Sequence, residues 1–256
     1  MSHMKTVILC GGKGTRMREE TEYRPKPLVE IGGKPILWHI MKLYSHYGFD
    51  DFVLTLGYKG RMIKEYFMYE RAFTNDFTLD TRNRNVHFHD EKKDNFNITF
   101  AETGLESLTG ERLLNVRRYL GDEFMVTYGD GIGDIAIDKL VAFHHTQGTV
   151  ATVTGVHPYS KWGLLQTNAA TGLVTGFYQK PILSDHVNGG FMVFNKKIFD
   201  YLDNGAVEDS FIRLSEIGQL SVYNHSGFWK AMDTYHEMLE MNETWNKNKP
   251  WAIWEK

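Results

Sequence analysis

A glycine-rich segment near the start of the chain carries residue types that bind phosphate. Gly11, Gly12 and Gly14 follow a short apolar stretch. Closely spaced glycines let the backbone turn sharply and bring several N–H groups within reach of one anion. Arg16, and Lys26 between two prolines, add fixed positive charge. The segment predicts a cradle for a polyphosphate, and the alternative is an ordinary strand-to-helix turn with solvated charges.

Two better-known phosphate-binding loops do not fit this segment. The dinucleotide fingerprint G-x-G-x-x-G would begin at Gly12 and needs glycine at position 17, where the chain has Met17. A P-loop needs an upstream glycine and a hydroxyl residue after its lysine, and neither Gly12-Lys13 nor Gly33-Lys34 has them. The loop is therefore of another kind, and Met17 disfavours a dinucleotide-dependent oxidoreductase.

Two acids from distant parts of the chain could share a metal ion. Asp130 lies between two glycines that leave room for a ligand, and Asp233 precedes the last helical segment. Mg²⁺ prefers oxygen ligands and binds carboxylates jointly with substrate phosphates. Each acid alone has a structural explanation, Asp130 as a turn former and Asp233 as a helix cap. Together with the cradle, they predict a Mg²⁺ site.

Strands and helices alternate in the first half of the chain. Apolar runs predict strands at 7–9 and 51–56, and apolar residues at helical spacing predict a helix that opens at Lys34-Pro35 and stops at Gly48. A second helix carries Ile63 on its apolar face. This order predicts an α/β fold with a Rossmann-like, mixed but mostly parallel central sheet flanked by helices. Ligands bind beyond the carboxyl ends of such strands, where the glycine loop lies.

The remaining segments complete the predicted domain. The polar stretch 74–97 predicts a β-hairpin insertion, and 123–128 predicts a central strand that ends at Gly129-Asp130. The second half predicts a mixed sheet region covering the site and a last helix at about 232–245; its strands are 150–156, 163–167, 174–178 and 190–194. We expect one domain over 4–256, with a nucleotide half at about 4–135 and a smaller acceptor-binding lobe at about 136–256.

Composition restricts the class of protein. The chain has 256 residues, 42% of them hydrophobic, which is enough for one sizeable core. A net charge of −3 argues against nucleic acid or an anionic membrane as partner, and no apolar run is long enough for a membrane helix. Cys10 is the single cysteine, which excludes an intramolecular disulfide. We expect a cytoplasmic protein, with residues 1–3 a tag remnant.

The loop and the segment after it resemble a known family signature. G-G-x-G-T-R followed by P-K-P is typical of sugar nucleotidyltransferases, and positions 11–16 and 25–27 match it. Within the family, the resemblance is greatest to the branch that transfers a cytidylyl group to glucose-1-phosphate. It covers nearly all of 4–256 and is carried by 34–41, 57–60, 127–131, 228–229, 232–234 and the hairpin insertion. It implies CTP, Mg²⁺, a homo-oligomer with subunit contacts through the insertion, and a surface or capsule polysaccharide pathway.

The resemblance also implies which residues bind the nucleotide. The segment around Thr103 and Thr109-Gly110 is similar to the one that holds the cytosine ring. The residues expected to bind nucleotide are Leu9, Gly11, Gly12, Gly14, Thr15, Arg16, Lys26, Gly57, Thr103, Thr109, Gly110 and Gly129.

The acceptor residues follow from two further motifs. Gln179-Lys180 stands where the family carries E-K-P, whose lysine contacts the acceptor phosphate and whose glutamate holds sugar hydroxyls. Asn188-Gly189 matches the N-G-G turn that faces the acceptor, and Gly163 matches a backbone contact to the sugar. Gln179 exchanges a charged hydrogen-bond acceptor for a neutral amide, so glucose-1-phosphate is held less firmly or another acceptor is preferred. Segment 207–212 departs from the W-E-x-x-P-L pattern and is assigned no role.

The expected reaction is in-line attack by an acceptor phosphate oxygen on the α-phosphorus of CTP, with release of pyrophosphate. Arg16, Lys26, Asp130 and Lys180 are its expected catalytic residues, and Asp130 and Asp233 its metal ligands. The first alternative is a CTP-dependent enzyme for another phosphorylated acceptor, such as a phosphorylated amino acid. The second is a non-catalytic nucleotide-sugar binding module, which the intact cradle and acids disfavour.

Overall fold

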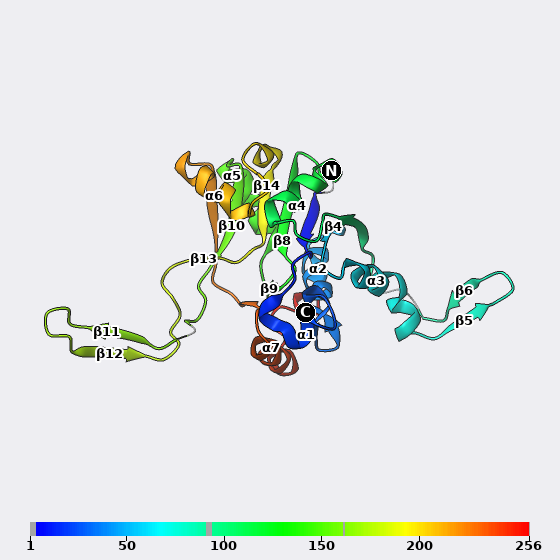
Figure 1. The fold of residues 1–256 in the computed structure, drawn as a ribbon, viewed down its shortest axis with the longest axis horizontal. Helices are drawn as coiled ribbons and strands as arrows, with labels where there is room; N and C mark the ends of the chain where they lie inside the picture. Colours follow the sequence, from blue (N-terminus) through cyan, green and yellow to red (C-terminus); the bar gives the residue numbers. More distant parts are fainter. Residues whose placement is uncertain (1–3, 91–93, 161, 256) are drawn as a thin grey trace.

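A mixed eight-stranded sheet forms the centre of the protein (Figure 1). The computed structural model describes residues 4–90, 94–160 and 162–255. The strand order is β13-β10-β14-β8-β1-β4-β7, and β15 also pairs with β10. The strands are β1 (Lys5–Leu9), β4 (Asp51–Leu56), β7 (Asn97–Glu102), β8 (Glu123–Tyr128), β10 (Ala151–Val156), β13 (Val187–Asn188), β14 (Met192–Asn195) and β15 (Leu220–His225).

Four neighbouring strands, β8, β1, β4 and β7, run parallel to one another. In their register Leu9 pairs with Tyr128 on one side and with Thr55 on the other. The glycine loop after β1 and the Gly129-Asp130 turn after β8 therefore leave the sheet at the same edge. The predicted mixed, mostly parallel sheet is confirmed.

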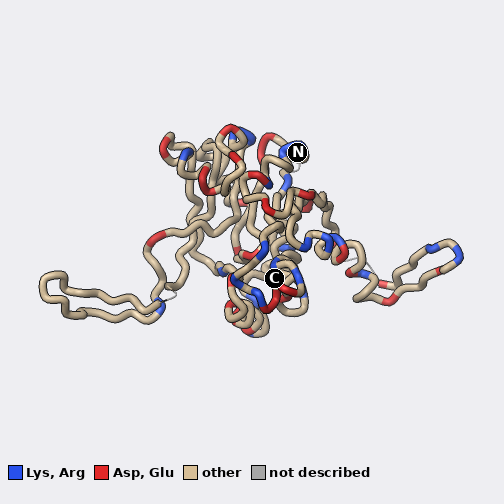
Figure 2. The backbone as a smooth tube through the Cα atoms, viewed as in Figure 1, with Lys and Arg blue, Asp and Glu red and all other residues tan. Residues whose placement is uncertain are grey.

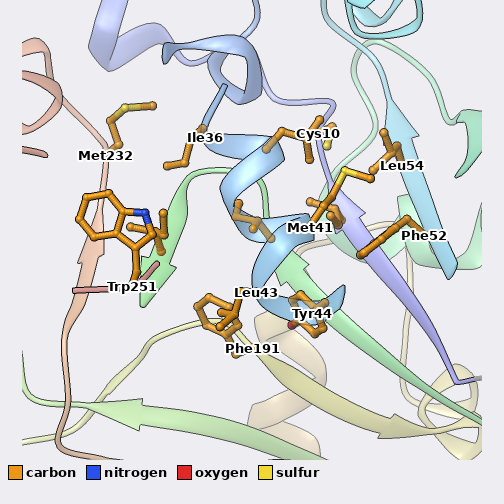
Figure 3. Close-up of a cluster of buried hydrophobic side chains, with 14 of the residues drawn as sticks. Cys10, Ile36, Met41, Leu43, Tyr44, Phe52, Leu54, Phe191, Met232 and Trp251 are labelled. Carbon is orange, nitrogen blue, oxygen red and sulfur yellow. The ribbon is translucent and has the colours of Figure 1, made fainter. Parts of the chain in front are cut away.

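Helices cover both faces of the sheet, and the alternation along β1 shows why. Ile8 packs into one hydrophobic cluster with side chains of α2, α3, α5 and α7, whereas Val7 and Leu9 pack into a second with α4 and α6. Figure 3 shows part of the first cluster, including Met41 and Tyr44 of α2 and Phe52 of β4. Successive side chains of a strand point to opposite faces, so the apolar run 7–9 of β1 needs cover on both. The helices are α1 (Arg18–Thr21), α2 (Ile36–His46), α3 (Gly60–Thr74), α4 (Thr109–Val116), α5 (Ile137–Gln147), α6 (Val207–Glu216) and α7 (Tyr235–Lys247). Short 3₁₀ turns lie at Thr15–Met17, Lys26–Leu28, Arg117–Tyr119, Lys196–Asp200 and Ile253–Glu255.

The predicted first long helix begins slightly later than the sequence indicated. Lys34–Pro35 form the short strand β3, which pairs with β2 (Glu30–Ile31), and Pro35 is the N-cap of α2 rather than its first residue. The last helix also begins later, at Tyr235, after the N-cap Thr234. The Thr234 hydroxyl accepts from the Glu237 N–H, and such a cap stabilises a helix start by about 1 kcal/mol.

The hairpin predicted within 74–97 is present and extends away from the sheet (Figure 1). It pairs β5 (Phe77–Asp80) with β6 (Asn85–Phe88). Part of the predicted insertion, 91–93, lies outside the described residues. Its end carries Arg82 and Arg84, and Figure 2 shows this arm bearing charge of both signs.

The second half of the chain differs from the prediction in one respect. We expected four strands to form one region covering the site, but only β10 and β14 belong to the main sheet. The other two, β11 (Leu164–Thr167) and β12 (Val174–Tyr178), form a separate antiparallel ribbon that projects from the opposite end of the molecule to the first arm (Figure 1). The prediction that these two strands help to cover the site is therefore wrong within this chain.

None of the helices in the described part of the chain combines the length and the apolar character that crossing a membrane would require.

Candidate active site

A cavity of about 440 Å³ opens at the carboxyl ends of β1 and β8. Residues predicted from the sequence make up much of its wall: Leu9, Gly11, Gly12, Gly14, Thr15, Arg16, Lys26, Thr109, Gly129 and Asp130. The wall is completed by Cys10, Pro27, Ser107, Leu108, Arg112, Tyr128, Ala206 and Glu208. The structure thus brings the glycine loop, one acid and the predicted base-binding segment together around one space.

Two contacts hold the glycine loop in shape. Gly14 has a φ of +61°, and a Cβ there would lie 2.7 Å from Thr21 Cγ2. The Thr21 hydroxyl donates to Gly14 O at 3.0 Å, and the Tyr58 N–H donates to Gly11 O at 3.1 Å. A left-handed backbone under a neighbouring side chain requires glycine. At Gly12, by contrast, a Cβ would meet no atom within 4 Å.

Lys26 joins the two predicted metal ligands. Its Nζ donates to Asp130 Oδ2 at 2.7 Å and to Asp233 Oδ1 at 2.9 Å. Arg16 also reaches Asp233, with Nη1 donating to Oδ2 at 3.0 Å and Nη2 lying 2.9 Å from Oδ1. The four charged side chains come from three separate parts of the chain, and they alternate in sign.

A small antiparallel pairing brings the two acids together. β9 (Gly131–Gly133) pairs with β16 (Trp229–Ala231), and the Met232 N–H donates to Asp130 O at 2.9 Å. Asp130 directly precedes β9, and Asp233 follows β16 after Met232, so this strand pairing holds the two acids near each other.

The ion pairs control the charge of Lys26. Burial alone lowers the pKa of its ammonium, but the charges and hydrogen bonds of Asp130 and Asp233 outweigh burial and raise the pKa above its usual value. Lys26 therefore stays protonated, with a side chain only 11% exposed. A buried cation with two carboxylate partners is suited to a site that receives a polyanion.

The donor set fits a hard divalent cation shared with a substrate. No group of three or more His, Cys, Asp or Glu side chains in the described ranges could hold a metal by itself. Asp130 and Asp233 offer two carboxylates, and the phosphates of a nucleotide would supply further oxygens, as Mg²⁺ requires. Each of these carboxylates contacts Lys26 through one of its two oxygens.

Arg112 is a buried cation of the cavity wall that the sequence did not single out. It is 3% exposed, and its Nη1 donates to Thr103 Oγ1 at 2.7 Å and Gly104 O at 2.9 Å. Its Nη2 donates to Gly11 O at 3.1 Å. Burial lowers the pKa of its guanidinium. One buried cation therefore clamps the glycine loop to the predicted base-binding segment. Arg112 lies four residues before Val116 on the apolar face of α4, and this spacing was the sequence feature that could have indicated its burial.

Some predicted nucleotide residues lie behind the cavity wall rather than in it. A Cβ on Gly57 would lie 2.8 Å from Arg112 Nη1, so glycine is needed there for the clamp to fit. Thr103 accepts from Arg112, as above. The Gly110 N–H donates to Gly205 O at 2.9 Å and joins α4 to the start of α6. These three residues support the cavity without lining it.

The predicted acceptor residues divide into two groups. Asn188 lies near the cavity, where its Nδ2 donates to the Tyr128 hydroxyl at 3.1 Å, and Gly189 O accepts from Trp229 Nε1 at 2.8 Å. Gly163 directly precedes β11, and Gln179 and Lys180 directly follow β12. None of the three lines the cavity, so within this chain the structure does not join them to the cradle.

Two observations place the ribbon residues. A Cβ on Gly163 would lie 3.2 Å from Gln179 Oε1, so these two are neighbours. Lys180 has a φ of +47° and lies near α7: the Lys230 hydrogen bond is the main cause that lowers the pKa of Glu240, and the charge of Lys180 adds to it.

Comparison with known proteins identifies the family. A family model described as nucleotidyl transferase matches residues 5–223. The chain is 47% identical over 257 residues to a protein of Bacillus subtilis (strain 168) named probable glucose-1-phosphate cytidylyltransferase, an alignment covering 98% of this chain and 100% of the relative. It is 42% identical over 259 residues to glucose-1-phosphate cytidylyltransferase of Salmonella typhimurium, with the same coverage. The chain belongs to the nucleotidyl transferase family of enzymes, which generally use a divalent metal ion.

Solved structures show the same fold at low identity. HddC from Yersinia pseudotuberculosis superposes with a TM-score of 0.68 at 20% identity, covering 94% of this chain and 99% of that one. A UDP-glucose pyrophosphorylase complexed with UDP-glucose gives 0.69 at 16% identity, covering 95% and 98%. These likenesses support the Rossmann-like architecture.

Proposed function

We propose that the protein transfers a cytidylyl group from CTP to a phosphorylated acceptor, with glucose-1-phosphate as the favoured acceptor and pyrophosphate as the second product. The observation that carries the proposal is Lys26 held between Asp130 and Asp233 at the mouth of the glycine cradle. The two relatives named above, at 47% and 42% identity over the whole chain, support the choice of nucleotide and acceptor.

The residues of the cavity have separate tasks in the proposed reaction. The N–H groups of the glycine loop and the Arg16 guanidinium bind the triphosphate, and Lys26 neutralises charge beside the reacting phosphorus. Little covalent work is left for the protein, because phosphoryl-type transfer depends on alignment and charge stabilisation. Leu9, Thr15, Thr109 and Gly129 shape the wall around the nucleoside.

Asp130 and Asp233 are the proposed ligands of Mg²⁺. When bound, this ion would withdraw charge from the phosphate oxygens and so ease attack on the α-phosphorus. Lys26 contacts both acids and would add its positive charge at the same place in the cavity.

The acceptor is the less constrained half of the proposal. Gly163, Gln179, Lys180, Asn188 and Gly189 are its proposed binding residues, with Lys180 on the acceptor phosphate. A second candidate function is cytidylyl transfer to a different phosphorylated compound, such as a phosphorylated amino acid. Gln179 favours it, because a neutral amide replaces the carboxylate that would hold sugar hydroxyls.

Pyrophosphate release from CTP and Mg²⁺ tests both candidates. Glucose-1-phosphate, other sugar 1-phosphates and phosphorylated amino acids are supplied in parallel. Turnover with glucose-1-phosphate supports the favoured acceptor, and turnover only with another phosphate supports the second candidate. Absence of turnover with every acceptor refutes the proposed function.

Replacing Asp130 by asparagine tests the site itself. Asparagine still accepts a hydrogen bond from Lys26 but is a poor metal ligand, so Asp130→Asn should lower kcat by at least about a thousandfold while the protein stays folded. Asp122→Asn is the matched control, because Asp122 is an exposed acid paired with Lys196. Activity close to wild type in Asp130→Asn would eliminate this acid as a metal ligand.

We also propose a cytoplasmic homo-oligomer. The β11–β12 ribbon carries no charged residue from 162 to 179, as Figure 2 shows, and its exposed side chains include Trp162, Leu165 and Phe177. A two-stranded ribbon with apolar faces is only marginally stable in water without a partner, which supports contact with another copy. Light scattering on the purified protein tests this, and a monomer at micromolar concentration would refute it.

A further inference from the structure

Three polar side chains form a hydrogen-bonded chain along one wall of the cavity. Asn188 of β13 donates from Nδ2 to the Tyr128 hydroxyl at 3.1 Å, and that hydroxyl donates to Glu208 Oε1. Tyr128 is the last residue of β8, and Glu208 is in the first turn of α6. Tyr128 and Glu208 both line the cavity. The segment from 207 to 212, without a role in the sequence analysis, thus contributes a side chain to the site.

The donor-to-acceptor direction of these hydrogen bonds is set at Asn188. Asn188 Oδ1 accepts from the Gly190 N–H at 3.0 Å, which leaves Nδ2 as the group that faces Tyr128. Burial, with the charge of Glu208 adding to it, raises the pKa of Tyr128, so its hydroxyl stays protonated and can donate. Each hydrogen therefore points toward Glu208.

The carboxylate at the downstream end is also held in position. The Val207 N–H donates to Thr109 Oγ1 at 2.8 Å, and the Ala206 N–H donates to Asp209 Oδ2 at 3.0 Å. These bonds fix the start of α6 against the wall that carries Thr109. Glu208 therefore faces the cavity from a rigid helix end rather than from a loose loop.

The chemistry of Glu208 selects what it can bind. A carboxylate has about four lone-pair sites, and Tyr128 uses one, so acceptor positions remain for a ligand. Asp130 and Glu208 are the acids among the described residues of the cavity wall, and Asp130 is committed to Lys26. A carboxylate repels phosphate, so its partner must be a hydroxyl or ammonium group.

We propose that Glu208 binds a hydrogen-bond-donating group, hydroxyl or ammonium, on the body of the phosphorylated acceptor, and that Tyr128 positions it. This inference rests on the proposed function. The Tyr128 hydroxyl accepts from Asn188 of the acceptor half, and Tyr128, Asp130 and Glu208 line the same cavity. A group bound by Glu208 would therefore share this cavity with the reacting phosphates. The ribose of the nucleotide carries the same hydroxyl chemistry, and the experiment below separates the two sources.

The test compares the two Michaelis constants in Glu208→Gln. The assay is pyrophosphate release, with glucose-1-phosphate as acceptor or, where the panel finds it inactive, the phosphate that the panel selects. Glutamine removes the charge and keeps the size, so the acceptor KM should rise about tenfold while the CTP KM changes less than about twofold. Tyr128→Phe should raise the acceptor KM by a smaller factor, because the carboxylate is retained but no longer oriented. Glu216→Gln, at the far end of α6, is the control and should change neither constant.

Other outcomes overturn the assignment. A CTP KM that rises as much as the acceptor KM, or more, places Glu208 on the ribose, and unchanged constants remove it from binding altogether. If Glu208→Gln does not fold, Glu208→Asp gives the same comparison, because it keeps the charge but withdraws it by one methylene. A wild-type protein that turns over no acceptor refutes the proposed function, whereas turnover with unaltered constants in the variants refutes only the role of Glu208.

Discussion

Replacing Lys26 by methionine is the most informative single change in the cavity. Methionine keeps the unbranched stem and removes the ammonium that lies 2.7 Å from Asp130 Oδ2 and 2.9 Å from Asp233 Oδ1. Two carboxylates would then face each other, with Arg16 still paired to Asp233. We expect the free energy of unfolding to fall.

The size of the loss follows from the number and exposure of the bonds. A hydrogen bond to a charged group contributes about 1.5–3 kcal/mol, so two would give several kcal/mol at most. The side chains of Asp130 and Asp233 are 31% and 20% exposed, so water compensates part of the loss. We expect a loss of about 2 kcal/mol, which for a chain of this length lowers Tm by about 4–8 °C.

Calorimetry with and without Mg²⁺, in the absence of nucleotide, is the assay. With the ammonium gone, a divalent cation can occupy the space between the two acids, so Mg²⁺ should raise the Tm of Lys26→Met more than that of the wild type. Lys13→Met is the control, because Lys13 pairs with Glu106 on the surface and should change stability by less than about 1 kcal/mol.

Two results would contradict this reasoning. A Tm equal to that of the wild type would mean that the ion pairs of Lys26 contribute nothing to the folded state. A lowered Tm that does not respond to Mg²⁺ would mean that Asp130 and Asp233 do not bind this ion in the absence of nucleotide.

The remaining predictions concern pH, the loop and the clamp. Burial alone lowers the pKa of Lys26, but its carboxylate partners raise the pKa above the usual 10.5. The contribution of Lys26 to stability is therefore complete below the usual pKa of 10.5 and is lost as the pH rises through the folded-state pKa. The Tm difference between wild type and Lys26→Met should therefore be constant to about pH 10 and shrink above it, as calorimetry over a pH series would detect. Gly11→Ala should lower the free energy of unfolding by about 2 kcal/mol in urea titrations, because its Cβ would lie 2.1 Å from Arg112 Nη1. Gly12→Ala is the control and should not lower it, because the space around its Cβ is open. Equal stabilities of the two variants would contradict the clamp. Arg112→Lys should cost a similar amount, since one ammonium cannot reach acceptors on both segments.

The parallel part of the fold could be predicted because its signals are local. The strands at 51–56 and 123–128 were predicted at the bounds that β4 and β8 have, since apolar β-branched runs between turn residues report their own burial. The ribbon could not be placed in the same way. β11 and β12 have the composition of ordinary strands, and nothing local distinguishes a strand that joins the main sheet from one that pairs outside it.

The site shows the same limit. The cradle residues and Asp130 were recognisable because they adjoin one another in the sequence or follow a strand. Arg112 and Glu208 were not recognisable, because their positions depend on partners about a hundred residues away in the sequence. Arg112 donates to Gly11, and the helix that carries Glu208 is bonded to Thr109. A side chain whose function depends on long-range contacts leaves little trace in its own neighbourhood.

The position of Cys10 has a practical consequence. Its thiol is 1% exposed in the turn between β1 and the glycine loop, and burial raises its pKa, with the charge of Asp130 adding to this. As the single cysteine of the sequence, it can react with an alkylating reagent only when the loop opens. The rate at which Cys10 is alkylated therefore reports how often the glycine loop opens. Mass spectrometry measures this rate without a label or an engineered residue.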